Sequence, residues 1–119
     1  MGMKEFARSQ ITEVTPQQWV KLERLCRSAG AKLEEAQLRS ATGMSPKVAL
    51  KVILRVAEQD GADLYWLVFH DDHFATRRRF DRGFQPVPWR CPDCEDVIED
   101  EDELRYEMQA VLREPLRFV

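Results

Sequence analysis

The sequence predicts an α+β fold in which three short helices precede a β-hairpin and a short C-terminal β extension. Three observations support this prediction. Capping signals precede Pro16 and Pro46, so helices are expected to begin there. Residues 64–69 form an aromatic and β-branched run, and residues 104–112 alternate apolar with mostly polar side chains. We divide the 119-residue chain into a weakly structured N-terminus (1–14), a main domain (15–90) and a C-terminal segment (91–119).

The first helix is expected to begin after Thr15. The sequence Thr15-Pro16-Gln17-Gln18 has the form of a capping box, with proline at the first helical position. Gly30 is expected to end the helix. The apolar stripe that this helix would bury consists of Trp19, Leu22, Leu25 and Cys26.

The second and third helices are expected to be joined by a tight turn. Residues 33–42 indicate a short helix, and Gly43 follows it. Ser45 is placed to cap the next helix, which begins at Pro46 and which Gly61 should end. On this third helix, residues 45–59, basic side chains lie on one face and valines and isoleucine on the other.

A hairpin is expected after the third helix. The strand 64–69 leads into a polar stretch rich in arginine, which suggests a charged hairpin tip. Residues 85–90 are interpreted as the returning strand, at a sheet edge because of Pro86 and Pro88. Residues 104–112 predict a last strand, and Trp19, Trp66 and Trp89 are assigned to the core.

The order of these elements resembles the winged helix-turn-helix domain of bacterial regulators over about residues 15–90. The resemblance depends on the Gly43 turn, on Ser45-Pro46 and on the stop at Gly61. It implies a non-catalytic regulator that binds duplex DNA, as a homodimer, through helix 45–59 and an arginine-rich wing. The DNA-contacting residues that the resemblance implies are Ser45, Lys47, Lys51, Arg55, Arg77, Arg78, Arg79 and Arg82.

The distribution of charge leaves a second function class open. Residues 1–60 hold ten Lys and Arg against seven Asp and Glu, residues 61–90 hold five against four, and residues 91–119 hold three against ten. An acidic C-terminal segment of this kind can dock onto a basic protein. The alternative is therefore a protein-interaction adaptor that uses the same fold. The acidic run itself, residues 95–103, is interpreted as a solvated loop because it lacks the pattern of a calcium loop.

Two pairs of metal-ligating residues share one spacing. Cys91 and Cys94 are separated by two residues, as are His70 and His73. Zinc prefers four nitrogen and sulfur ligands in a tetrahedron, so these four residues predict one structural zinc site. The sequence leaves open whether Cys26 supplies a third ligand instead of the histidines, or whether a second chain completes the site.

Enzymatic function is not expected. The sequence CPxC resembles the glutaredoxin-type active site, which leaves thiol-disulfide exchange as a less favoured alternative. Glu95 and Asp96 follow the motif directly and are expected to hold the thiol protonated. No phosphate-binding glycine loop or catalytic triad is evident from the spacing, and no catalytic residue is assigned.

The sequence also indicates a cytoplasmic location. No apolar run approaches the ~20 residues that span a bilayer, and the N-terminus lacks the apolar segment of a signal peptide. Three unevenly spaced cysteines do not form a disulfide framework, which fits a reducing compartment.

Overall fold

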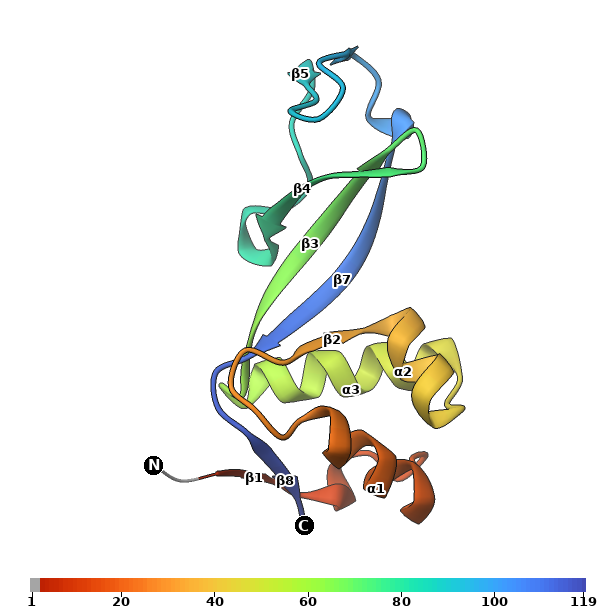
Figure 1. Ribbon diagram of the computed structural model, residues 1–119, viewed down its shortest axis with the longest axis vertical. Coiled ribbons are helices and arrows are strands. Elements are labelled where there is room, and N and C mark those ends of the chain that lie inside the picture. The colour runs from red at the N-terminus through yellow and green to blue at the C-terminus, as the bar shows by residue number, and fades with distance from the viewer. Residues whose placement is uncertain (1–2) are drawn as a thin grey trace. The chain divides into compact units, whose positions relative to one another are not determined.

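The computed structural model describes residues 3–119 and confirms an α+β fold with mostly antiparallel sheets (Figure 1). Two compact units are present. The helical unit comprises the residues up to Asp63 together with Gln109–Val119, and the hairpin unit comprises Leu64–Met108. The helices and longer elements in chain order are β1 (Lys4–Phe6), α1 (Pro16–Leu25), β2 (Lys32–Glu34), α2 (Glu35–Thr42), α3 (Pro46–Glu58), β3 (Ala62–His70), β4 (His73–Arg79), β5 (Trp89–Arg90), β6 (Val97–Ile98), β7 (Leu104–Leu112) and β8 (Leu116–Phe118). Single 3₁₀ turns lie at Arg8–Gln10, Phe80–Arg82 and Glu101–Glu103.

The predicted starts of α1 and α3 are confirmed, whereas α2 begins at Glu35, two residues later than expected, because residues 32–34 form β2. At α1, the Thr15 hydroxyl accepts a hydrogen bond from the Gln18 amide (3.2 Å), and the Gln18 side chain accepts one from the Thr15 amide (3.0 Å). At α3, the Ser45 hydroxyl accepts a hydrogen bond from the Val48 amide (3.3 Å). These bonds satisfy backbone N–H groups that have no partner within the first helical turn. Gly43 caps α2 with φ of 78°, as the turn requires.

Gly61 follows α3, but its role differs from that of a left-handed cap. The positive φ falls on Asp60 (58°), whereas Gly61 lies against the end of the helix. A Cβ at Gly61 would lie 3.0 Å from the Val56 carbonyl oxygen and 3.2 Å from Val56 Cγ1. Glycine is therefore needed here because the backbones approach closely, and the chain can turn directly into β3.

The prediction of a weakly structured N-terminus is wrong for residues 4–14, whereas residues 1 and 2 lie outside the described part of the chain. Strand β1 pairs in parallel with β8, with Phe6 opposite Phe118. Phe6, Trp19 and Phe118 then pack together, with ring centroids 4.9–6.2 Å apart. Ile11 and Val14 are also buried. Burial of these apolar side chains, rather than a local signal, orders the segment.

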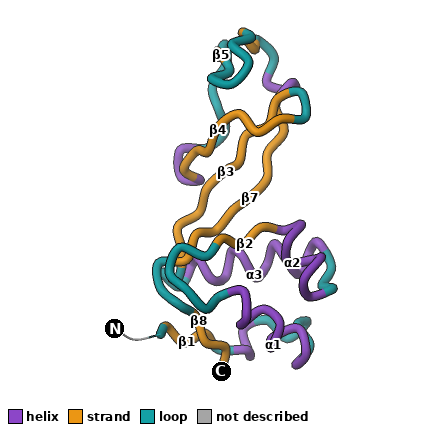
Figure 2. The backbone as a smooth tube through the Cα atoms, in the orientation of Figure 1, coloured by secondary structure: helices purple, strands orange, loops and turns teal. Residues whose placement is uncertain are grey.

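The hairpin differs from the prediction in its returning strand. Strand β4 pairs antiparallel with β3, and the turn between them is Asp71-Asp72, with φ of 49° and 61°. Arg77, Arg78 and Arg79 therefore lie on a strand and not at a loop tip. Of residues 85–90, only Trp89–Arg90 form a strand, which pairs with β6 in a separate two-stranded sheet. Figure 2 shows how much of the segment between β4 and β7 is loop.

One sheet has the strand order β2-β7-β3-β4, so the predicted last strand is confirmed and lies between β2 and β3. β2, which pairs antiparallel with β7, was not predicted. The expected boundary at residue 90 does not coincide with the compact units, whose limits fall within β3 and β7.

Apolar side chains are buried in each unit. Trp19 is buried in the helical unit, as predicted. In the hairpin unit, Trp66 and Trp89 are half-buried: Trp66 packs against Phe80, Phe84 and Tyr106, and Trp89 packs against the small core. That core consists of Val68, Cys91, Ile98 and Leu104. Among residues 3–119, none of the helices has the length and apolar character needed to cross a membrane.

Candidate metal centre and basic surfaces

The two histidines are positioned by the β3–β4 turn. His70 and His73 are the last paired residues of the hairpin, on either side of Asp71-Asp72. Because directly opposed residues of an antiparallel pair project to the same face, both imidazoles lie on one side of the sheet. Their ring centroids are 5.5 Å apart. A two-residue turn with both φ values positive thus converts the H-x-x-H spacing into a pair of neighbouring ligands.

The two cysteines are positioned by a compact turn after β5. The Glu95 amide donates a hydrogen bond to the Cys91 carbonyl (2.9 Å), and the Cys91 amide donates one to the Asp96 carbonyl (2.9 Å). Glu95 takes a positive φ of 66°, which closes the turn. Cys91 is buried in the small core of the hairpin unit, and Cys94 is exposed.

The four side chains converge in the hairpin unit. The donor atoms of His70, His73, Cys91 and Cys94 all lie within 4.8 Å of one another. Cys91 Sγ is 3.5 Å from His73 Nε2, and Cys94 Sγ is 3.6 Å from His70 Nδ1. A tetrahedral zinc ion with Zn–S of about 2.3 Å and Zn–N of about 2.0–2.1 Å separates neighbouring sulfur and nitrogen ligands by about 3.5 Å. The four side chains could therefore hold a metal ion such as zinc.

The electrostatics of the metal-free group favour a thiolate at Cys91. Burial raises the pKa of this thiol, but hydrogen bonds from the Cys94 amide and the His73 side chain outweigh it and lower the pKa from 9.0 to about 6. The expectation that the acidic neighbours keep this thiol protonated is therefore wrong for Cys91. For Cys94, the Asp96 amide lowers the pKa, but burial and the Cys91 side chain outweigh it, so the net shift is upward. The hydrogen bond to Cys91 raises the pKa of His73.

Two aspartates lie just outside the four ligands. Asp71 Oδ2 is 3.5 Å from Nε2 of His70, the ring nitrogen that does not face Cys94. A carboxylate that accepts a hydrogen bond from the second nitrogen of a histidine ligand fixes its tautomer and its orientation, and Asp71 is placed to do this for His70. Asp93 Oδ2 is 3.5 Å from His73 Nε2, the ring nitrogen that faces Cys91, so Asp93 does not contact the second nitrogen of His73. Spacing alone did not point to either aspartate, although each is adjacent in the chain to one of the four residues.

Cys26, which the sequence left open as a third ligand, does not belong to this group. It is fully buried in the helical unit, and burial raises the pKa of its thiol to about 12. Its carbonyl accepts a hydrogen bond from the Leu116 amide (2.9 Å). Cys26 is therefore a packing residue. Among residues 3–119, the cluster that could hold a metal contains Cys91 and Cys94 but not Cys26.

The predicted basic residues of α3 lie in the helical unit. Lys47 is exposed and has no ion pair with any other described residue. Lys51 contacts Glu13, and Arg55 contacts Glu58 (3.2 Å). Ser45 uses its hydroxyl for the helix cap. Two of the three cations on this helix thus already have a carboxylate partner.

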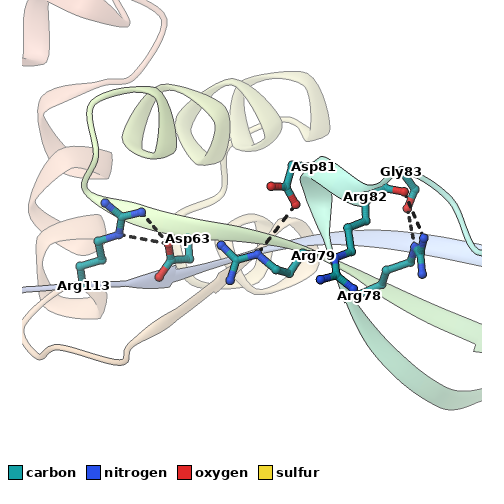
Figure 3. Close-up of polar contacts among 7 residues, drawn as sticks. All are labelled: Asp63, Arg78, Arg79, Asp81, Arg82, Gly83 and Arg113. Carbon is teal, nitrogen blue, oxygen red and sulfur yellow. Dashed lines mark hydrogen bonds and ion pairs between the residues drawn. The ribbon is translucent and has the colours of Figure 1, made fainter.

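The predicted wing arginines lie in the hairpin unit and have separate environments (Figure 3). Arg78 donates hydrogen bonds to the backbone carbonyls of Gly83 (2.9 Å) and Arg82 (3.1 Å), so it holds the loop after β4. Arg79 reaches Asp81 at 3.8 Å. Arg77 lies over the ring of Tyr65, and the Arg82 side chain is exposed.

Comparison of the chain with family models, with curated proteins and with solved structures gave no match.

Proposed function

We propose that this protein is a non-catalytic zinc protein, in which His70, His73, Cys91 and Cys94 bind one structural zinc ion. The observation that carries the proposal is the convergence of two nitrogen and two sulfur donors within 4.8 Å. Four protein ligands leave no coordination position for water or substrate, which is the arrangement of structural rather than catalytic zinc.

The role of the ion follows from the size of the hairpin unit. Its small core is a cluster of four buried residues, one of which is the candidate ligand Cys91, with Ala75, Val87, Trp89 and Tyr106 partly buried against it. Units with so little buried apolar surface usually need a metal or disulfides to fold. Zinc would join the β3–β4 turn to the Cys91–Cys94 turn and so fix the loops between β4 and β7.

The test is metal content and coordination in the purified chain. We expect about one zinc per chain by elemental analysis, and Co²⁺ substitution should give the intense visible bands of a tetrahedral site with thiolate ligands. Cys91→Ser and Cys94→Ser should each abolish stoichiometric zinc. Cys26→Ala is the matched control, because it removes a cysteine outside the group. A wild-type chain without zinc, or equal zinc loss in the control, would contradict the proposal.

Duplex DNA binding by the helical unit is a second candidate function. The element order α1-β2-α2-α3-β3 and the position of β7 beside β2 and β3 favour the winged-helix resemblance. Exposed ion pairs such as Arg55–Glu58 contribute little to stability, so phosphate can replace the carboxylate. Retention on duplex DNA should fall steeply as salt rises, and Lys51→Glu should abolish it. If the wild type is not retained at low salt, the adaptor alternative is favoured.

A further inference from the structure

One face of the hairpin unit combines exposed arginines with aromatic rings. The pairs Tyr65–Arg79 and Leu67–Arg77, and Phe69–Phe74 after a bulge, place these side chains on the same side of β3 and β4. The opposite side carries Trp66 and Val68, which pack against the loops and the small core. β7 adds Arg105 beside Phe69. We call this surface the arginine–aromatic face; its six members are Tyr65, Phe69, Phe74, Arg77, Arg79 and Arg105.

The guanidinium groups stack on the rings. Arg77 Cζ lies 4.2 Å from the centroid of the Tyr65 ring, and Arg105 Cζ lies 4.4 Å from that of Phe69. Arg79 Cζ is 6.0 Å from the Tyr65 centroid. The Phe74 ring meets Phe69 edge to face and is 50% exposed. At these distances the rings attract the guanidinium groups of Arg77 and Arg105 and help to hold them over the aromatic surface.

The charge of this face is only partly compensated. Arg79 has Asp81 at 3.8 Å, and Arg105 has Glu107 at 3.4 Å. Both arginine side chains are more than half exposed, so water screens these pairs strongly. Arg77 has no ion pair with any described residue. The acidic residues of the hairpin unit are instead concentrated between Asp93 and Glu103.

We propose that the arginine–aromatic face binds single-stranded nucleic acid. Its cations complement phosphates, and the half-exposed Phe74 and the stacked guanidinium planes offer surfaces on which unpaired bases stack. In a duplex the bases are already stacked on one another, so this face would offer a duplex only its charges. The proposal concerns a surface other than α3 and goes beyond the zinc site.

The test is fluorescence anisotropy of a labelled oligothymidine of ~20 nucleotides with the full zinc-loaded chain, between 50 and 200 mM salt. With about three phosphates neutralised, the slope of log K against log salt should be about −2. Arg77→Gln and Arg105→Gln should each make this slope shallower by about 0.7. Phe74→Ala should weaken binding by about five- to a hundredfold and leave the slope unchanged, because stacking releases no counterions.

Lys47→Gln is the matched control, because it removes one exposed cation from α3 and should leave oligothymidine binding unchanged. Zinc content and circular dichroism of each variant, compared with the wild type, identify any loss of fold. Binding of Phe74→Ala that equals the wild type would overturn the proposal. So would tighter binding of an equal-length duplex that Lys47→Gln weakens, which would favour α3 instead. Displacement by polyglutamate at the same charge concentration would also count against it, since it would show that charge alone suffices.

Discussion

Lys51 on α3 donates a hydrogen bond to the carboxylate of Glu13, a residue that precedes α1 in the chain. The hydrogen bond from Lys51 is the largest influence on Glu13 and holds its pKa below the ordinary value. The helix that the winged-helix resemblance assigns to a DNA groove thus has one of its central cations engaged within the helical unit. Because Glu13 competes with phosphate for Lys51, substitution of Glu13 tests whether Lys51 contacts DNA.

Glu13→Gln should strengthen duplex DNA binding if α3 contacts phosphate. The substitution removes the carboxylate that competes for Lys51, and a screened surface pair of this kind should change affinity by no more than about fivefold. Filter binding or anisotropy at 50 mM salt measures the effect. Glu35→Gln, which removes the partner of Arg39 on α2, is the control. An equal gain in both variants would reflect net charge alone and would argue against contact through Lys51.

Zinc affinity should fall as the pH is lowered. The pKa of Cys91 is lowered to about 6, so its thiolate is present above that pH and is lost as the pH falls through it. The raised pKa of His73 means that this ring also holds a proton more firmly than an ordinary histidine. Zinc must displace both protons in acid, so we expect affinity at pH 5 to be at least ~100-fold lower than at pH 7. Competition with a chromophoric chelator measures this, and a pH-independent affinity would be inconsistent with these ligands.

Asp71→Asn should weaken zinc binding without removing a ligand. The Asp71 carboxylate lies 3.5 Å from His70 Nε2, where it can accept a hydrogen bond and orient the ring. Loss of such an outer partner typically costs about 10–100-fold in metal affinity. Asp72→Asn is the control, because it changes the neighbouring turn residue and retains the ability to adopt a positive φ. Equal zinc affinities in the two variants would show that Asp71 has no orienting role.

Gly61→Ala should destabilise the helical unit by about 1–3 kcal/mol, the usual cost of forcing an additional carbon into a packed site. The new Cβ would lie 3.0 Å from the Val56 carbonyl oxygen. This oxygen belongs to the backbone, so it cannot move away as easily as the end of a flexible side chain could. Urea denaturation measures the change. Ala57→Gly, a helix substitution nearby that adds no atom, should cost about 1 kcal/mol through helix propensity alone. If Gly61→Ala has the same free energy of unfolding as the wild type, the close approach of residue 61 to Val56 does not require glycine.

Local signals in the sequence predicted where α1 and α3 begin, but not that α1 ends at Leu25, before Gly30, or that α2 begins only at Glu35. Thr15 with Gln18, and Ser45 with Pro46, act over three or four residues, so the bonds that they form can be inferred without knowing the rest of the fold. The convergence of the four candidate metal ligands was predictable for a similar reason, because each pair has a short fixed spacing. The spacing could not predict the contact of Asp71 with His70, because that contact depends on the orientation of the imidazole ring.

The strands were predicted poorly where their stability comes from distant partners. β1, β2 and β8 have three residues each, and their pairing joins positions far apart in the chain. β4 lacks apolar alternation because an edge strand tolerates charge, so its arginines were assigned to a loop tip. The turn before it contains no glycine, which removed the usual hairpin signal.

The parallel pairing of β1 with β8 affects the order in which the two units can be completed during synthesis. The helical unit requires Phe118 beside Phe6 and Trp19, so it cannot close until almost the whole of this chain has left the ribosome. The hairpin unit is continuous in the chain and contains all four candidate metal ligands, so its parts emerge earlier. Vectorial translation would therefore let metal uptake precede closure of the helical unit, the reverse of the usual order in which the N-terminal part folds first.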